Sequence, residues 1–182
     1  ISNDSLIIAG SDNNNYKITG STTTNKVRIG SGYKGTITLS NCSIVSTAGG
    51  KLGELSDSLS YPPFWVQGQY NGNNHNPDTK VNIVLEGDNY IAYYGFAYAA
   101  LQVDQGAQIN ISAIRPEDNA SGSLFARSNA YDPGYFFWSN TGAAIGAPSY
   151  SSATFLGGIA QMLPEQGRAT IYNADGTTHC PL

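Results

Sequence analysis

The chain has 182 residues, a net charge of −4 and only 12% charged residues. This length fits one domain with a sizeable core. The nine basic residues are scattered, and the lack of a basic stripe argues against nucleic acid as a partner. The longest largely apolar stretch, 91–103, is too short to span a bilayer, so we expect no membrane insertion of this segment. Polar positions rich in Asn, Ser, Thr and Gly favour an all-β, extracellular protein.

Short runs of alternating apolar residues predict strands along most of the chain. Each run has Gly, Asn or Asp near its ends, as expected where strands pass into turns. The predicted strands, in chain order, are 6–8, 26–29, 36–39 with a continuation at 43–45, 81–85, 101–103, 108–111 and 169–172.

Two of these segments form similar strand–turn–strand units. The first runs from Val27 to Leu39 and the second from Leu101 to Ile111, each with a glycine-containing turn, and a weaker third copy begins at Gly167. The units do not recur at a fixed spacing. Imperfect units of this kind are typical of a β-solenoid whose successive turns carry insertions.

The segment 99–111, Ala-Ala-Leu-Gln-Val-Asp-Gln-Gly-Ala-Gln-Ile-Asn-Ile, resembles a turn of the right-handed parallel β-helix domains of large surface proteins of gut Firmicutes. Leu85-Glu-Gly-Asp-Asn89 resembles the preceding motif of that family, and Gly142-Ala-Ala-Ile-Gly-Ala147 a later one. Gly167-Arg-Ala-Thr-Ile-Tyr172 is a loose match to the family's C-terminal motif. The resemblance implies surface display with carbohydrate binding or adhesion. The sequence departs from the family motif at Ala147, where the motif has a second glycine.

We therefore expect a short right-handed parallel β-helix with decorated loops, and the alternative is an antiparallel β-sandwich. Residues 1–182 should form a single domain. The chain begins at Ile1 without an initiator Met, so either a preceding segment is removed by processing or the piece is excised from a larger surface protein; its ends, Ile-Ser-Asn and Cys-Pro-Leu, favour excision. Loop insertions are expected at about 47–80 and 127–141.

The first insertion combines aromatic rings with amides and a carboxylate. Rings cover the C–H faces of sugars, while amides and carboxylates bind hydroxyl groups. The alternative is a loop whose aromatic residues are buried against the strands. The candidate ligand-binding residues here are Tyr61, Phe64, Trp65, Gln67, Tyr70, Asn74 and Asp78.

The second insertion contains Tyr135-Phe-Phe-Trp138. In an extended segment these four side chains cannot all point the same way. Tyr135 and Trp138 are therefore further candidates for ligand contact, and packing within the core or against another loop is the alternative.

Catalytic motifs are absent from the sequence: it contains neither a G-x-S-x-G nor an H-E-x-x-H pattern. Parallel β-helices host sugar lyases and glycosidases, so Glu86, Asp88 and Asp104 are the candidate acids if the chain is an enzyme. Glu86 and Asp88 would share one face of a strand. Solvated turn carboxylates are the alternative, and we expect no enzyme.

The sequence leaves two questions open: whether the two cysteines form a disulfide, and whether the chain binds Ca²⁺. Cys42 and Cys180 either form a disulfide or are two buried free thiols. Segments 11–15 and 173–176 supply oxygen atoms that suit Ca²⁺, but neither has the spacing of a known calcium motif, and Asx turns explain both. We therefore expect no cofactor.

The sequence thus predicts a non-catalytic binding or adhesion module on a bacterial surface, or a secreted one, with a glycan or a host or neighbouring-cell ligand as partner. A structural or protein-binding adhesin segment is the second hypothesis, and a polysaccharide lyase or glycoside hydrolase is the third.

Overall fold

The computed structural model describes residues 5–46, 61–68, 78–94, 98–104, 106–113, 122–128 and 144–146, and the backbone of strands at 159–162 and 168–171. The elements of these residues are all strands, without a helix, which confirms the all-β prediction. They are β1 (Ser5–Ile8), β2 (Tyr16–Thr22), β3 (Lys26–Ile29), β4 (Lys34–Ser46), β5 (Phe64–Val66), β6 (Thr79–Tyr93), β7 (Leu101–Val103), β8 (Ala107–Ala113), β9 (Gly122–Ser128), β10 (Ile145–Gly146), β11 (Ile159–Met162) and β12 (Arg168–Ile171).

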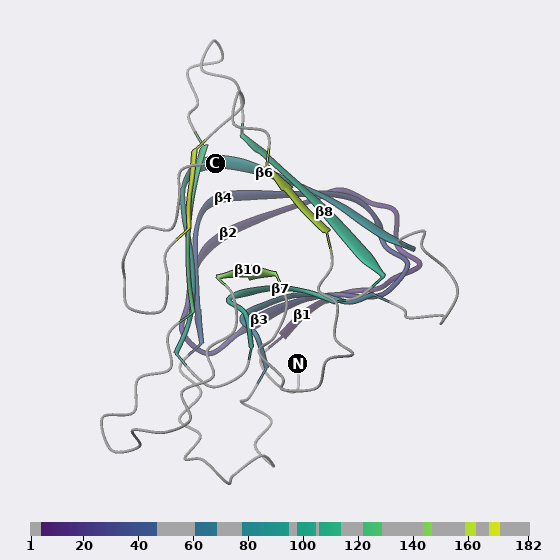
Figure 1. The fold of residues 1–182 in the computed structure, drawn as a ribbon, viewed down its shortest axis with the longest axis horizontal. Coiled ribbons are helices and arrows are strands. Elements are labelled where there is room, and N and C mark those ends of the chain that lie inside the picture. Colours follow the sequence, from purple (N-terminus) through teal and green to yellow (C-terminus); the bar gives the residue numbers. More distant parts are fainter. Residues whose placement is uncertain are drawn as a thin grey trace, which may run out of the picture.

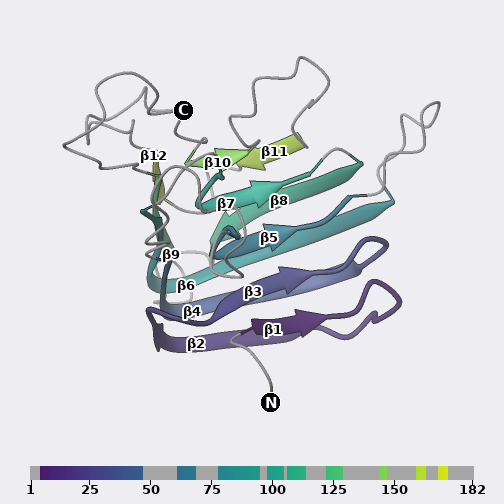
Figure 2. The ribbon, with the colours of Figure 1, turned by 90° about the horizontal axis from the view of Figure 1, so that it is seen from below.

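The strands form two parallel sheets. Sheet A has the order β1-β3-β5-β7-β10, and sheet B has the order β11-β8-β6-β4-β2, with β9 paired to β6 and β12 paired to β9. From β1 to β8 the chain passes alternately from one sheet to the other, so that strands of each sheet stack in chain order (Figure 2). Every strand pair in the described part of the chain is parallel, so the antiparallel sandwich alternative is wrong.

Long strands of sheet B bend in the middle. Viewed along the stack, the first half of β4 or β6 lies on one side of a three-sided outline and the second half on another, with sheet A as the third side (Figure 1). The first half of β6, before the bend, pairs with β8, and the second half, after the bend, pairs with β9. The bend therefore divides the neighbouring layer into two separate strands.

Alternating side chains fill the interior in rows that run across the strands. In sheet A, Val27, Phe64 and Leu101 are aligned, and in sheet B, Ile37, Ile83 and Ile111 are aligned. Val27 is 5% exposed, and the other five are at most 3% exposed. Burial of such apolar side chains contributes about 1.5–3 kcal/mol each, so these rows supply much of the stability of the stack.

Strand β5 corrects the predicted loop insertion at about 47–80. Its residues Phe64-Trp-Val66 pair with β3 on one side and β7 on the other. A run of three residues next to Pro62 and Pro63 has too little alternation to be recognised as a strand. Similarly, β9 includes 127 and 128, so the second insertion does not begin at 127.

The bend between the two halves of sheet B becomes longer along the stack. Paired residues on either side of it are Thr19 and Ser21 in β2, Ser40 and Ser43 in β4, and Glu86 and Tyr90 in β6. Each layer therefore inserts one residue more than the layer before it, as successive β-bulges. Asn41 takes a φ of 48° and Gly87 a φ of 64°, which is the left-handed region that asparagine and glycine adopt most easily.

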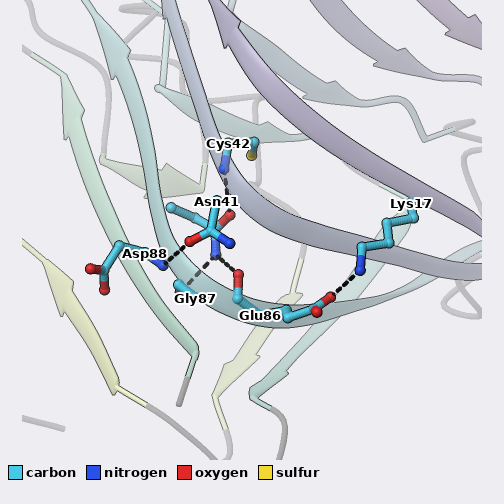
Figure 3. A network of polar contacts seen from close by, with 7 residues as sticks. Lys17, Asn41, Cys42, Glu86, Gly87 and Asp88 are labelled. Atoms are coloured by element: carbon cyan, nitrogen blue, oxygen red, sulfur yellow. Dashed lines mark hydrogen bonds and ion pairs between the residues drawn. The ribbon is translucent and has the colours of Figure 1, made fainter. Parts of the chain in front are cut away.

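Asparagine side chains satisfy the backbone at this bend (Figure 3). Asn89 is 2% exposed, and its Oδ1 accepts a hydrogen bond from the Cys42 amide at 3.0 Å. Its Nδ2 donates to the carbonyls of Glu86, Gly87 and Ser123. The Asp88 amide donates to Asn41 Oδ1 at 3.2 Å. Backbone groups that lose sheet partners at the bend therefore have side-chain partners instead.

Candidate binding surface on sheet A

The outward face of sheet A carries a second aligned row. Ile7, Arg28, Trp65 and Gln102 follow one another across β1, β3, β5 and β7. They alternate with the buried row of Val27, Phe64 and Leu101, so their side chains point away from the core. A β-ladder thus places Arg28 and Gln102 on either side of Trp65, about 4.8 Å away on each neighbouring strand.

Tyr61 stacks on this row. Its ring lies 5.7 Å from the Trp65 ring, with an angle of 12° between the planes, and 6.3 Å from Tyr98. Tyr61 is 46% exposed, whereas Trp65 is only partly exposed. Pro63, whose carbonyl accepts a hydrogen bond from the Val27 amide at 2.8 Å, fixes the backbone just after Tyr61. We call Tyr61, Trp65 and Tyr98 the Tyr61 cluster, and Tyr61 is the ring that it presents to solvent.

Two cations of β3 lie against these rings. Lys26 Nζ is 5.6 Å from the centre of the Tyr61 ring, and the Arg28 guanidinium is 5.2 Å from the centre of the Trp65 ring. Both distances are within the range of cation–π interactions. Arg28 also donates through Nε to Gln67 Oε1 at 2.8 Å. The Tyr61 cluster and its neighbours Arg28 and Gln67 therefore combine aromatic rings, a guanidinium and an amide on one surface.

Asp104 holds the indole of Trp65 in place through a hydrogen bond. Its Oδ2 accepts a hydrogen bond from Trp65 Nε1 at 2.7 Å, and its Oδ1 accepts one from Gln102 Nε2 at 2.9 Å. Burial raises the pKa of Asp104 above its usual value, and the two hydrogen bonds and the charge of Arg28 partly oppose this effect. Gln102 is 3% exposed, and its Oε1 has no hydrogen-bond partner among the described residues.

Several of the predicted ligand-binding residues come together here, but one does not. Tyr61, Trp65 and Gln67 lie at the cluster. Asp78 directly precedes Thr79, whose hydroxyl donates to the Gln67 carbonyl at 2.8 Å. Phe64 is 0% exposed because the alternation of β5 points it into the core, so its prediction as a ligand contact is wrong. The remaining predicted residues lie outside the described residues: Tyr70, Asn74, Tyr135 and Trp138.

Sequence reasoning missed four residues of this surface, namely Lys26, Arg28, Tyr98 and Gln102. Three of them come from strands predicted correctly at 26–29 and 101–103. The alternation of 26–29 was recognised, but only the register of β3, β5 and β7 places Arg28 beside Trp65.

The three candidate acids do not converge. Gly87 bends the chain between Glu86 and Asp88, so they do not share a strand face as predicted, and their carboxylates point apart (Figure 3). Glu86 forms an ion pair with Lys17 at 2.6 Å, and Asp88 accepts a hydrogen bond from the Ser123 hydroxyl at 2.6 Å. Asp104 directly follows β7 of the other sheet and is hydrogen-bonded to Trp65 and Gln102.

Asp12 forms the Asx turn that was the alternative to a calcium site. Its Oδ1 accepts hydrogen bonds from the backbone and side-chain nitrogens of Asn14, and its Oδ2 accepts one from the Tyr16 hydroxyl. Within the described ranges, no group of three or more His, Cys, Asp or Glu residues is arranged to hold a metal ion. Residues 173–176 lie outside those ranges.

Cys42 is a buried free thiol at the start of the second half of β4. Burial raises its pKa to about 11, so it is protonated at neutral pH. Cys180, with which a disulfide was considered, lies outside the described residues.

Comparisons with protein-family models, with curated proteins and with solved structures found no match to this chain. A search of the described residues for a helix of sufficient length and apolarity to cross a membrane found none.

Proposed function

We propose that the chain is a right-handed parallel β-helix and that it acts as a non-catalytic binding module at a bacterial cell surface or after secretion. The fold proposal is supported by parallel pairing between strands of successive layers and by the regular passage from sheet A to sheet B. The extracellular setting is supported by the low content of charged residues and by the resemblance of 99–111 to surface-protein domains.

The proposed ligand is a carbohydrate that binds to the outward face of sheet A. The observation that carries this proposal is the half-exposed ring of Tyr61, stacked on Trp65 and bordered by Arg28 and Gln67. A sugar ring offers C–H groups to an aromatic face and hydroxyl groups to amide and guanidinium donors at its edge. The exposed side chains of Tyr61 and Arg28 are the groups through which a polysaccharide would make contact.

The non-catalytic part of the proposal is supported by how the acids are used. Glu86 and Asp88 are engaged with Lys17 and Ser123, and Asp104 is occupied by the indole and amide of Trp65 and Gln102. A glycosidase needs two carboxyl groups about 5–9.5 Å apart on either side of the scissile bond. Release of new reducing ends from any polysaccharide of the panel below would contradict this part.

The binding proposal is tested by tryptophan fluorescence during titration with plant, mucin and microbial polysaccharides. The chain has two tryptophans, so a Trp138→Phe variant leaves Trp65 as the sole reporter. We expect a saturable change with one polysaccharide class, loss of binding in Tyr61→Ala and retention in Tyr61→Phe, because phenylalanine keeps the stacking ring.

A flat response of the Trp138→Phe variant across the panel would contradict carbohydrate binding at Tyr61. The chain would then be better explained as a structural or protein-binding adhesin segment. Circular dichroism of Tyr61→Ala is the control for folding, and we expect no change, since the side chain is half exposed.

A further inference from the structure

Arg28 lies in the centre of the candidate surface with most of its donors unused. It is exposed, lies beside Trp65 across the β3–β5 pair, and has its guanidinium over the indole ring. Only its Nε donates to a described residue, Gln67. The two Nη nitrogens form no hydrogen bond or ion pair with any residue of the described ranges. This arrangement presents a fork of donors next to an aromatic surface.

The guanidinium is also held in a defined orientation. The hydrogen bond that Arg28 Nε donates to Gln67 and the contact of the guanidinium with the Trp65 ring restrict its rotation. Less side-chain freedom is therefore lost when a ligand binds. Guanidinium forks match the two oxygens of a carboxylate in geometry and bind them through parallel hydrogen bonds.

The nearby negative charge does not satisfy Arg28. Asp104 is the carboxylate closest to it in the described part of the cluster, and both its oxygens already accept hydrogen bonds, from Trp65 and from Gln102. Lys26 Nζ also lies against the Tyr61 ring, but Lys26 is only 7% exposed. The positive group presented to solvent beside the exposed Tyr61 ring is therefore the guanidinium of Arg28, although the whole chain carries a net charge of −4.

We propose that the carbohydrate bound at this surface is acidic, and that Arg28 binds a sugar carboxylate while the sugar ring stacks on Tyr61. This inference rests on the proposed function and adds the chemical class of the ligand. A uronic acid and a sialic acid share the chemistry concerned, a carboxylate attached to a pyranose ring, and the test distinguishes between them.

The test compares acids with neutral counterparts of the same backbone. The ligands are polygalacturonate and its methyl ester, and sialyllactose and its methyl ester, each titrated calorimetrically against the whole chain. We expect one acid to bind at least about tenfold more tightly than its neutral counterpart, because esterification of the carboxylate abolishes a charge-assisted, bidentate contact. The pair that shows the difference identifies the uronic or the sialic acid.

Variants of Arg28 separate the fork from simple attraction between charges. Arg28→Gln should reduce the affinity for the acid about tenfold or more, and should reduce the affinity for the neutral counterpart much less, because only the acid loses a charge-assisted contact. Arg28→Lys keeps the charge but not the fork and should restore only part of the loss. Since Arg28 is exposed, we expect unchanged thermal unfolding in both variants.

Equal binding of acid and neutral counterpart, or normal acid binding by Arg28→Gln, would overturn the inference. If Tyr61→Ala still abolished that binding, the proposed carbohydrate function would stand without the acidic class. Absence of binding by every ligand of this set and of the wider panel would overturn both.

Discussion

The most informative single residue is Asp104, a carboxylate that is buried to hold an indole. A lone buried carboxylate is costly, and the hydrogen bonds from Trp65 and Gln102 reduce that cost. Because burial raises the pKa of Asp104 in the folded state, the folded chain binds more protons than the unfolded chain at a pH just above the ordinary pKa of the carboxyl group. Its contribution to stability therefore falls as the pH rises through the folded-state pKa.

Trp65→Phe removes the indole N–H and leaves Asp104 with one donor fewer. We expect the free energy of unfolding at pH 7 to fall by about 1–3 kcal/mol, the cost of leaving a buried polar group unsatisfied. The loss should shrink at acidic pH, as the pH falls through the folded-state pKa of Asp104, which burial raises. Urea unfolding at pH 7 and at acidic pH measures this effect, with Trp65→Phe in an Asp104→Asn background as the control, where a loss with no pH dependence is expected. A loss that is the same at both pH values in the original background would contradict the role of Asp104.

Gly87 is a second residue whose role depends on one backbone angle. With a φ of 64°, a Cβ added there would lie 2.1 Å from Asn41 Oδ1. Gly87→Ala should lower the free energy of unfolding by about 2 kcal/mol or more, from left-handed strain and the clash together. Gly20→Ala is a matched control, because Gly20 has a φ of 93° but nothing within 4 Å of an added Cβ. Equal losses in the two variants would show that strain alone acts and that the Asn41 contact has no energetic importance.

At the scale of elements, β5 is the segment on which prediction and structure differ most. Phe64 is fully buried between Val27 and Leu101, whereas Trp65 faces outward. Phe64→Ala should cost about 3–5 kcal/mol, as expected for a large core side chain. Tyr61→Ala, which alters a half-exposed ring of the same segment, should cost about 1 kcal/mol or less. Chemical denaturation of both variants tests this, and a cost below about 1 kcal/mol for Phe64→Ala would mean that 64–66 is a loop, as the sequence suggested.

The contrast between β3 and β5 explains how far the sequence could predict the elements. Lys26-Val-Arg-Ile29 alternates cleanly and was predicted with the correct bounds, as was 101–103. By contrast, β2 and β9 were not recognised. Tyr16–Thr22 has only Ile18 as an aliphatic residue, and Gly122–Ser128 mixes Arg127 with Phe125. Their strand character depends on neighbouring layers, which local alternation cannot report.

The similar units at 27–39 and 101–111 are also informative about register. Val27 and Leu101 do occupy equivalent positions, with Phe64 between them. Ile37, however, is aligned with Ile111 through Ile83, and not with Ile109 as the sequence similarity suggested. The repeat therefore predicts which strands are equivalent but not their register in sheet B. In sheet A it relates β3 to β7 but does not reveal β5 between them, so it does not place Trp65 between Arg28 and Gln102.

At the scale of the whole molecule, the first layer of the described strands has a neighbouring layer on one side only. Strands β1 and β2 are at the edges of their sheets among the described strands, each paired on one side only. Leu6 is aligned with the buried Val27 yet is 46% exposed, and Ile7 is 63% exposed. A layer with one neighbour buries less apolar surface than a layer with two, so local opening from this side should need less free energy than opening in the middle.

Amide hydrogen exchange measures this difference along the stack. We expect amides of β1 and β2 to exchange well before those of β4 and β6, whose interior rows are almost fully buried on both sides. Cys42 gives an independent measure in a Cys180→Ser variant, because reagents reach its buried thiol only after the layers around it open. Its modification should therefore be slower than exchange in β1 and speed up with urea. Uniform protection of β1, β2, β4 and β6 would instead mean that the stack opens as one cooperative unit, so that the exposed Leu6 and Ile7 do not weaken the first layer.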